Sequence, residues 1–116
     1  MKVLLDHDVP HGLRLPLTGK HEVATAQYQG WADFDDESLI AAAEGQFDAL
    51  ITLDTNLAHQ QNLGSRKLGV VVVDLHPVVP SHLKASLGKI RSALAMIGEK
   101  PGVVVVREGD IDRLEA

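Results

Sequence analysis

The stretch Val70-Val71-Val72-Val73 decides the fold class, because four consecutive valines leave no polar residue on either face of a strand. Strands that are apolar on both faces are typical of parallel sheets, whose two faces are covered by helices. The stretch from Val103 to Val106 repeats the pattern. The sequence therefore predicts at least two strands that are buried on both sides.

Outward from these valines, short apolar runs alternate with helix signals along the whole chain. Further strands are predicted at 3–5, 21–26 and 49–53. Helices are predicted at 10–17, 37–44, 55–63 and 81–97. Such alternation predicts a single three-layer αβα domain over 1–116, with a mostly parallel five-stranded sheet and right-handed crossovers. The charged tail at 108–116 is expected to fray.

The two longer helices carry recognisable end signals. Asp35 or Asp36 is expected to cap the helix at 37–44, which Gly45 closes. Ser81 is expected to cap the helix at 81–97. Apolar residues recur in that helix at spacings of three and four, which predicts one buried stripe. They are Leu83, Leu87, Ile90, Leu94 and Ile97.

Composition narrows the class of protein. Eleven Lys and Arg residues against sixteen Asp and Glu give a net charge of −5, which argues against a broad electrostatic nucleic-acid surface. Aromatic residues are scarce, so base-stacking platforms are not expected. There is no cysteine, and no segment approaches the roughly 20 apolar residues that a membrane helix needs. We expect a cytoplasmic protein that does not engage a membrane.

Acidic residues mark one edge of the predicted sheet. Asp6 ends the first strand and Asp54 ends the third. Asp8 follows Asp6 by two residues, so its side chain would point to the same side as that of Asp6 if the chain stays extended. Asp36 opens a helix on the same side. In open α/β sheets, ligands bind beyond the carboxyl ends of the strands, so these four side chains are candidate site residues.

Crowded carboxylates repel one another unless protons or a cation neutralise them. Mg²⁺ and Mn²⁺ prefer oxygen ligands, and such an ion polarises a phosphoryl oxygen and activates water. Asp6, Asp36 and Asp54 are therefore candidate catalytic residues for phosphodiester hydrolysis, and Asp8 is a fourth candidate metal ligand. The alternative stays open that Asp6 or Asp54 is a turn residue and that Asp36 is a helix cap.

Polar neighbours of Asp54 are candidate substrate contacts. Thr52 precedes it by two residues, and its hydroxyl could orient a carboxylate or contact a metal-bound water. Asn56 and Gln60 follow it and could hydrogen-bond a substrate, although they could equally coat an exposed helix. The six histidines show no paired spacing that would indicate zinc. His7, next to Asp6, could serve as an extra ligand or base.

Three segments resemble a small bacterial PIN-like family whose members are often predicted to be toxins of toxin–antitoxin pairs. They are VLLDHDVP at 3–10, GWADFDDESLIAAA at 30–43 and FDALITLDTNLAHQQNL at 47–63. The resemblance implies a PIN-like fold, acidic residues that bind Mg²⁺ or Mn²⁺, and cleavage of RNA. It carries over to Asp6, Asp36 and Asp54, with Thr52 as support. The family commonly has Glu after the first Asp, whereas this chain has His7, with Asp8 one position later.

The leading hypothesis is thus a metal-dependent ribonuclease, with RNA as substrate and an antitoxin protein as a partner; a homodimer is left open. One alternative is a catalytically inactive PIN-like module that binds a partner protein. Another is a receiver-like signalling domain, in which Asp54 would accept phosphate. A receiver needs Ser or Thr after the fourth strand and Lys after the fifth, and this chain has Asp74 and Arg107 there.

Overall fold

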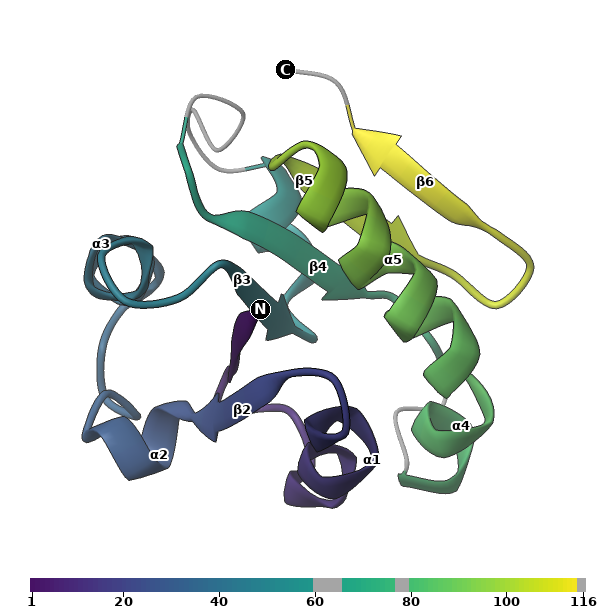
Figure 1. The fold of residues 1–116 in the computed structure, drawn as a ribbon, viewed down its shortest axis with the longest axis horizontal. Coiled ribbons are helices and arrows are strands. Elements are labelled where there is room, and N and C mark those ends of the chain that lie inside the picture. Colours follow the sequence, from purple (N-terminus) through teal and green to yellow (C-terminus); the bar gives the residue numbers. More distant parts are fainter. Residues whose placement is uncertain (60–65, 77–79, 115–116) are drawn as a thin grey trace.

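The structure is a computed structural model of the chain, and it describes residues 1–59, 66–76 and 80–114. One six-stranded sheet has the order β2-β1-β3-β4-β5-β6. β1 to β5 run parallel, and β6 is antiparallel to β5 (Figure 1). The strands are β1 (Lys2–Leu5), β2 (Glu22–Thr25), β3 (Ala49–Thr52), β4 (Gly69–Val73), β5 (Val103–Val106) and β6 (Ile111–Leu114).

Helices cover both faces of this sheet, as the three-layer prediction requires. They are the 3-10 turns η1 (His11–Leu13) and η2 (Thr55–His59), and the α-helices α1 (Arg14–Thr18), α2 (Ala26–Gln29), α3 (Asp36–Glu44), α4 (Pro80–Ala85) and α5 (Leu87–Glu99). One core cluster joins the sheet to α1, α4 and α5. The other joins it to α2, α3 and η2. None of the helices that the structure describes is long and apolar enough to cross a membrane.

The four valines of β4 behave as the pattern predicts. Val71 and Val73 belong to one core cluster, while Val70 and Val72 belong to the other. Each is at most 1 % exposed. Full burial of a valine contributes about 1.5–3 kcal/mol, so the run stabilises both layers at once. α5 packs so close to Gly69 that a Cβ atom there would lie 2.1 Å from Cγ2 of Ile97.

The prediction of five strands and a fraying tail is wrong for residues 111–114, which form a sixth strand. A turn closed by the hydrogen bond from Arg107 N to Asp110 O, 2.9 Å long, reverses the chain and pairs β6 with β5. The Arg113 guanidinium then donates to the carbonyl oxygens of Met96 and Pro101, at 2.7 and 3.1 Å. Charged side chains on an edge strand hid this element in the sequence.

Two other elements differ from their predictions. The second strand ends at Thr25, whose hydroxyl accepts a hydrogen bond from the Tyr28 amide and so starts α2. The long helix is broken at Ser86, which has φ −97° and ψ 10°, and its first piece begins at Pro80 rather than at a Ser81 cap. The predicted apolar stripe is nevertheless buried or half-buried along both pieces.

Helix starts also depend on local hydrogen bonds. Asp35 is the cap of α3, because its Oδ1 accepts from the Ser38 amide at 2.7 Å. That bond lowers the pKa of the Asp35 carboxyl. The segment predicted as a helix from Pro10 begins as the 3-10 turn η1. After β3 the chain forms the 3-10 turn η2, and residues 60–63 of the predicted helix lie outside the described residues.

Candidate functional site

The strand order creates a switch point between β1 and β3. β1 lies between β2 and β3, so the connections that leave β1 and β3 diverge at the carboxyl ends of these strands. In doubly wound sheets such a point forms the ligand-binding crevice. Asp6 follows β1 and Asp54 follows β3, so the fold brings both loops to this point.

Asp6 is the buried centre of the site, with a side chain that is only 3 % exposed. Its Oδ1 accepts from the His7 amide at 2.8 Å and lies 3.0 Å from His7 Nδ1. Its Oδ2 accepts from the Thr52 hydroxyl at 2.8 Å. A buried carboxylate needs such donors to offset its lost hydration, and three of them fix its orientation.

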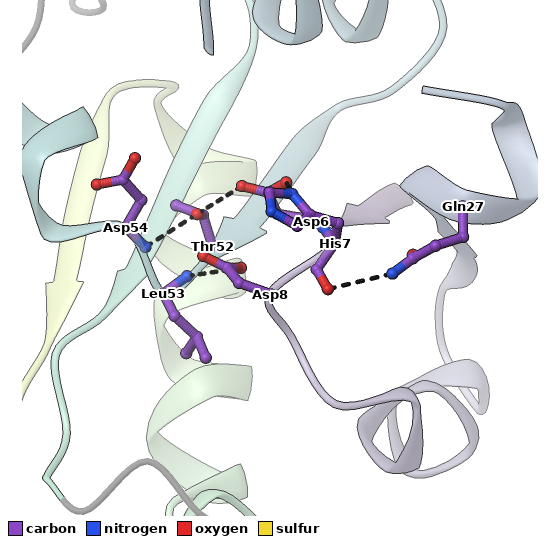
Figure 2. A network of polar contacts seen from close by, with 7 residues as sticks. All are labelled: Asp6, His7, Asp8, Gln27, Thr52, Leu53 and Asp54. Atoms are coloured by element: carbon purple, nitrogen blue, oxygen red, sulfur yellow. Dashed lines mark hydrogen bonds and ion pairs between the residues drawn. The ribbon is translucent and has the colours of Figure 1, made fainter. Parts of the chain in front are cut away.

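Thr52 ties the two loops together. Its hydroxyl is fully buried, donates to Asp6 and accepts from the Asp54 amide at 3.1 Å (Figure 2). This is the orienting role that the sequence suggested for Thr52. Because the side chain is fully buried, Thr52 acts through Asp6 rather than from the surface of the site.

Asp8 reaches the site by a turn and not along an extended chain. The Val9 amide donates to the Asp6 carbonyl at 3.0 Å, which closes the turn. The turn directs Asp8 across to the other loop, where its Oδ1 accepts from the Leu53 amide at 3.2 Å. Burial raises the pKa of the Asp8 carboxyl, and the charges of Asp6 and Asp54 raise it further, against the lowering effect of the Leu53 amide.

His7 is the exposed member of the cluster, with a side chain that is 57 % exposed above the buried Asp6. The hydrogen bond to Asp6 raises the pKa of the imidazole, and the charges of Asp6, Asp8 and Asp36 add to this effect. The side-chain amide of Gln27 in α2 donates to the His7 carbonyl at 3.1 Å and so holds the loop after β1 in place. The exposed imidazole therefore lies next to the buried Asp6 carboxylate, in the negative potential of the neighbouring acidic residues.

Asp54 is held differently from Asp6. Its Oδ1 accepts from the Asn56 amide at 3.0 Å, which starts η2. In Figure 2 its carboxylate points away from Asp6 and Asp8. Asn56 is exposed, while Asp54 is half-buried. Asp54 thus combines a turn-forming role with a place at the edge of the acidic cluster.

Asp36 is the first residue of α3 and is half-buried. Since Asp35 caps the helix, Asp36 is not the cap that the sequence left open. Its charge adds a small part of the rise in the pKa of the His7 imidazole. Gln60, the remaining predicted contact, lies outside the described residues.

The chemistry of the donors suits a hard cation, but they do not form a complete cage. Over residues 1–59, 66–76 and 80–114, no group of three or more His, Cys, Asp or Glu side chains is arranged to hold a metal ion. Asp6 and Asp8 are the two carboxylates held in position by the opposite loop. The four-ligand set of Asp6, Asp8, Asp36 and Asp54 stays a prediction.

Sequence reasoning missed residues whose role depends on neighbours distant in sequence. Gln27 contributes through the His7 carbonyl, and Leu53 contributes only its backbone amide. The sequence around Gln27 and Leu53 gave no indication of these roles, because their hydrogen-bond partners, His7 and Asp8, are distant in sequence. The scarcity of aromatic residues also concealed Tyr28, which is 84 % exposed on α2.

The ends of β4 and β5 complete this edge of the sheet. Asp74 follows β4 and lies 3.2 Å from His76 Nε2, and Arg107 follows β5 and lies 3.5 Å from an Asp112 oxygen. Asp74 thus pairs within its own loop, and Arg107 pairs with a residue of β6. Comparison of the chain with protein-family models, with curated proteins and with solved structures finds no match.

Proposed function

We propose that the protein is a metal-dependent ribonuclease of the PIN-like kind that acts as the toxin of a toxin–antitoxin pair. The observation that carries the proposal is the buried, cross-bonded Asp6 beside Asp8 at the switch point of the sheet. Two carboxylates held close together at a ligand-binding crevice repel one another unless a proton or a cation neutralises them. Burial is the main cause of the raised pKa of Asp8, and the charge of Asp6 raises it further.

A single Mg²⁺ or Mn²⁺ fits the two carboxylates that the loops hold. Mg²⁺ is usually bound by one or two carboxylates and keeps several waters. Asp6 and Asp8 would hold it, because Oδ2 of Asp8 has no hydrogen-bond partner among the described residues. Asp36 and Asp54 would act through the bound waters. The ion would polarise a phosphoryl oxygen of the RNA and lower the pKa of a bound water.

The protein's own groups prepare this site. The Thr52 hydroxyl and the Leu53 amide orient Asp6 and Asp8 from the opposite loop. The Nδ1 atom of His7 bonds to Asp6, so the other ring nitrogen is left to meet a substrate. The imidazole is exposed above the buried Asp6, so it would hydrogen-bond a phosphate oxygen of the RNA.

The metal site is tested by Mn²⁺ titration calorimetry on wild type, Asp6→Asn and Asp54→Asn. We expect binding in the wild type, its loss in Asp6→Asn, and weaker binding in Asp54→Asn. Glu99→Gln, which removes one exposed charge at the end of α5, is the matched control and should bind as the wild type does. Cleavage of single-stranded RNA should follow the same order. Full activity in either aspartate variant would overturn the proposal.

A second candidate function is a catalytically inactive PIN-like module that binds a partner protein. The outward-pointing Asp54 carboxylate and the lack of a three-ligand group among the described side chains favour it. It predicts no metal affinity tighter than millimolar, together with a stable complex with the product of a neighbouring gene. A toxin would form that complex too, so the calorimetry separates the two functions.

The strand order also keeps the receiver alternative testable. β2-β1-β3-β4-β5 is the order of flavodoxin-like folds, which include receiver domains. Asp74 and Arg107 stand where a receiver needs Ser or Thr and Lys. We expect Asp54 to take up no phosphate from acetyl phosphate with Mg²⁺, as measured by mass spectrometry; stoichiometric uptake would favour the receiver.

A further inference from the structure

A hollow of about 1050 Å³ lies beside the edge strand β2, next to the acidic site and not over it. Within the described residues, β2 is the edge strand of the sheet and pairs with β1, so its other edge faces this hollow. α1 and α2 lie on either side of β2 in Figure 1. The lining includes two cations, an exposed aromatic ring and several side-chain amides: Lys2, Arg14, Tyr28, Gln27, Gln29 and Gln46.

Arg14 supplies the charge of the hollow. Its Nε donates to the Val23 carbonyl at 3.1 Å, which anchors the exposed side chain across the edge of β2. Among the described residues, none accepts from its two Nη groups. Lys2 lies 4.0 Å from Glu22, so those two charges largely offset one another. An anchored guanidinium with free donors is suited to a phosphate group.

Tyr28 supplies an aromatic face. It projects from the short helix α2 and is 84 % exposed, an unusual position for a large ring. The other three aromatic side chains contact one another instead: Trp31 stacks on Phe34 at 6.0 Å and meets Phe47 edge-on at 6.1 Å. An exposed ring that lines the same hollow as a cation can serve as a stacking platform for an unpaired base.

Gln27 connects the hollow to the acidic site. It lines the hollow, and its side chain donates to the His7 carbonyl. A strand of nucleic acid whose scissile phosphate lay over His7 and Asp6 would therefore pass Gln27 and enter the hollow. The edge of β2 is a poorer site for an added peptide strand, because Arg14 already occupies the Val23 carbonyl.

We infer that the hollow beside β2 binds a nucleotide of single-stranded RNA, with its base stacked on Tyr28 and its phosphate on Arg14. The inference rests on the proposed ribonuclease function for the identity of the ligand. It also accounts for RNA binding by an acidic protein, because a local pair of contacts replaces a broad basic surface.

The test measures the affinity for a labelled single-stranded RNA octamer by fluorescence anisotropy. EDTA is present to remove divalent cations, so that metal-dependent cleavage does not occur. Stacking of one base contributes about 1–3 kcal/mol, so Tyr28→Ala should weaken binding about 5- to 150-fold. Tyr28→Phe keeps the ring and should bind as the wild type does. Arg14→Gln should weaken binding and lower the slope of log affinity against log salt by about 0.7, as expected for one phosphate contact on a single strand.

Lys100→Gln removes an exposed charge at the far end of α5 and should change neither affinity nor slope. Equal binding by wild type, Tyr28→Ala and Arg14→Gln would overturn the inference. So would an absence of RNA binding together with slowed hydrogen exchange of the Val23 and Thr25 amides in a complex with a co-expressed protein, which would make this edge a protein-docking site.

Cleavage assays with Mn²⁺ separate this inference from the proposed function. If the wild type and both hollow variants cleave RNA with the same KM, the nuclease stands and the subsite fails. If binding depends on Tyr28 and Arg14 but no metal supports cleavage, the hollow stands as an RNA site and the nuclease proposal fails.

Discussion

The loops after β1 and β3 read alike in sequence, since each strand ends in an aspartate, but they hold that aspartate in opposite ways. Asp6 is almost fully buried and is tied to the other loop by Thr52. Asp54 is half-buried and uses a carboxylate oxygen to start its own turn. The difference shows that a strand-end aspartate acquires its role from the donors around it.

The largest effect is expected where the two loops are joined. Thr52→Val removes the hydroxyl that Asp6 accepts from and that the Asp54 amide donates to. Leaving a buried charged acceptor without its donor costs about 1–3 kcal/mol, so the free energy of unfolding in urea should fall by that amount. RNA cleavage should fall about 10- to 100-fold, as is usual for a residue that positions a metal ligand.

Thr52→Ser keeps the hydroxyl and is the matched control. It should recover most of the cleavage, although it loses a buried methyl group. If Thr52→Val unfolds at the same urea concentration as the wild type, the buried link between the loops does not contribute to stability, and the contrast with Asp54 loses its basis.

A smaller effect is expected at Asp54, where two roles can be separated. Asp54→Ala removes the oxygen that accepts from the Asn56 amide and should cost about 1 kcal/mol, within the range of lost capping bonds. Asp54→Asn keeps an oxygen in the same place, so it should keep the stability while weakening Mn²⁺ binding. Urea unfolding and calorimetry on the same samples give both quantities; equal metal binding in all three proteins would reduce Asp54 to a turn residue.

The smallest effect is expected in the pH dependence of stability, where two histidines at opposite ends of the sheet, His7 and His21, should differ in pKa. In metal-free protein, the carboxylates raise the pKa of His7 above 6.5, whereas burial and the charges of the terminal amine, Lys20 and Arg91 lower that of His21. His7 therefore contributes stability below pH 6.5 that is lost as pH rises through its folded pKa. His21 lowers stability as pH falls below 6.5.

NMR titration of the two imidazoles in EDTA should give the order His7 above 6.5 above His21. His21→Gln should flatten the acid side of the stability curve, because it removes the buried Nδ1 that has no hydrogen-bond partner in the described structure. The reverse order of pKa values would mean that the carboxylates do not surround His7 in solution.

Much of the fold could be predicted because its signals are local. The valine runs, the apolar stripe of α5 and the cap of α3 each depend on residues within a few positions of one another. β6 and the break at Ser86 could not be predicted in the same way. β6 is stabilised by pairing with β5 and by Arg113 bonds to Met96 and Pro101, which are distant in sequence.

For the candidate site, too, the local features could be predicted from the sequence and the contacts between distant segments could not. The aspartates at the strand ends, and their gathering at one edge, follow from strand positions and parallel order. Which oxygen accepts from which donor does not follow, because Thr52 meets Asp6 and the Leu53 amide meets Asp8 only when β1 and β3 pair in register. The hollow beside β2 likewise exists only because β2 is an edge strand.

By itself, the sequence determined a doubly covered, mostly parallel α/β sheet with acidic residues at the carboxyl ends of its strands, because burial patterns and strand-end residues are properties of neighbouring positions. Only the tertiary structure decided that Asp6 is buried and Asp54 turned outward, that Asp8 arrives by a turn, and that Arg14 and Tyr28 share a hollow. Those outcomes depend on hydrogen bonds and packing between segments that the chain order does not place together.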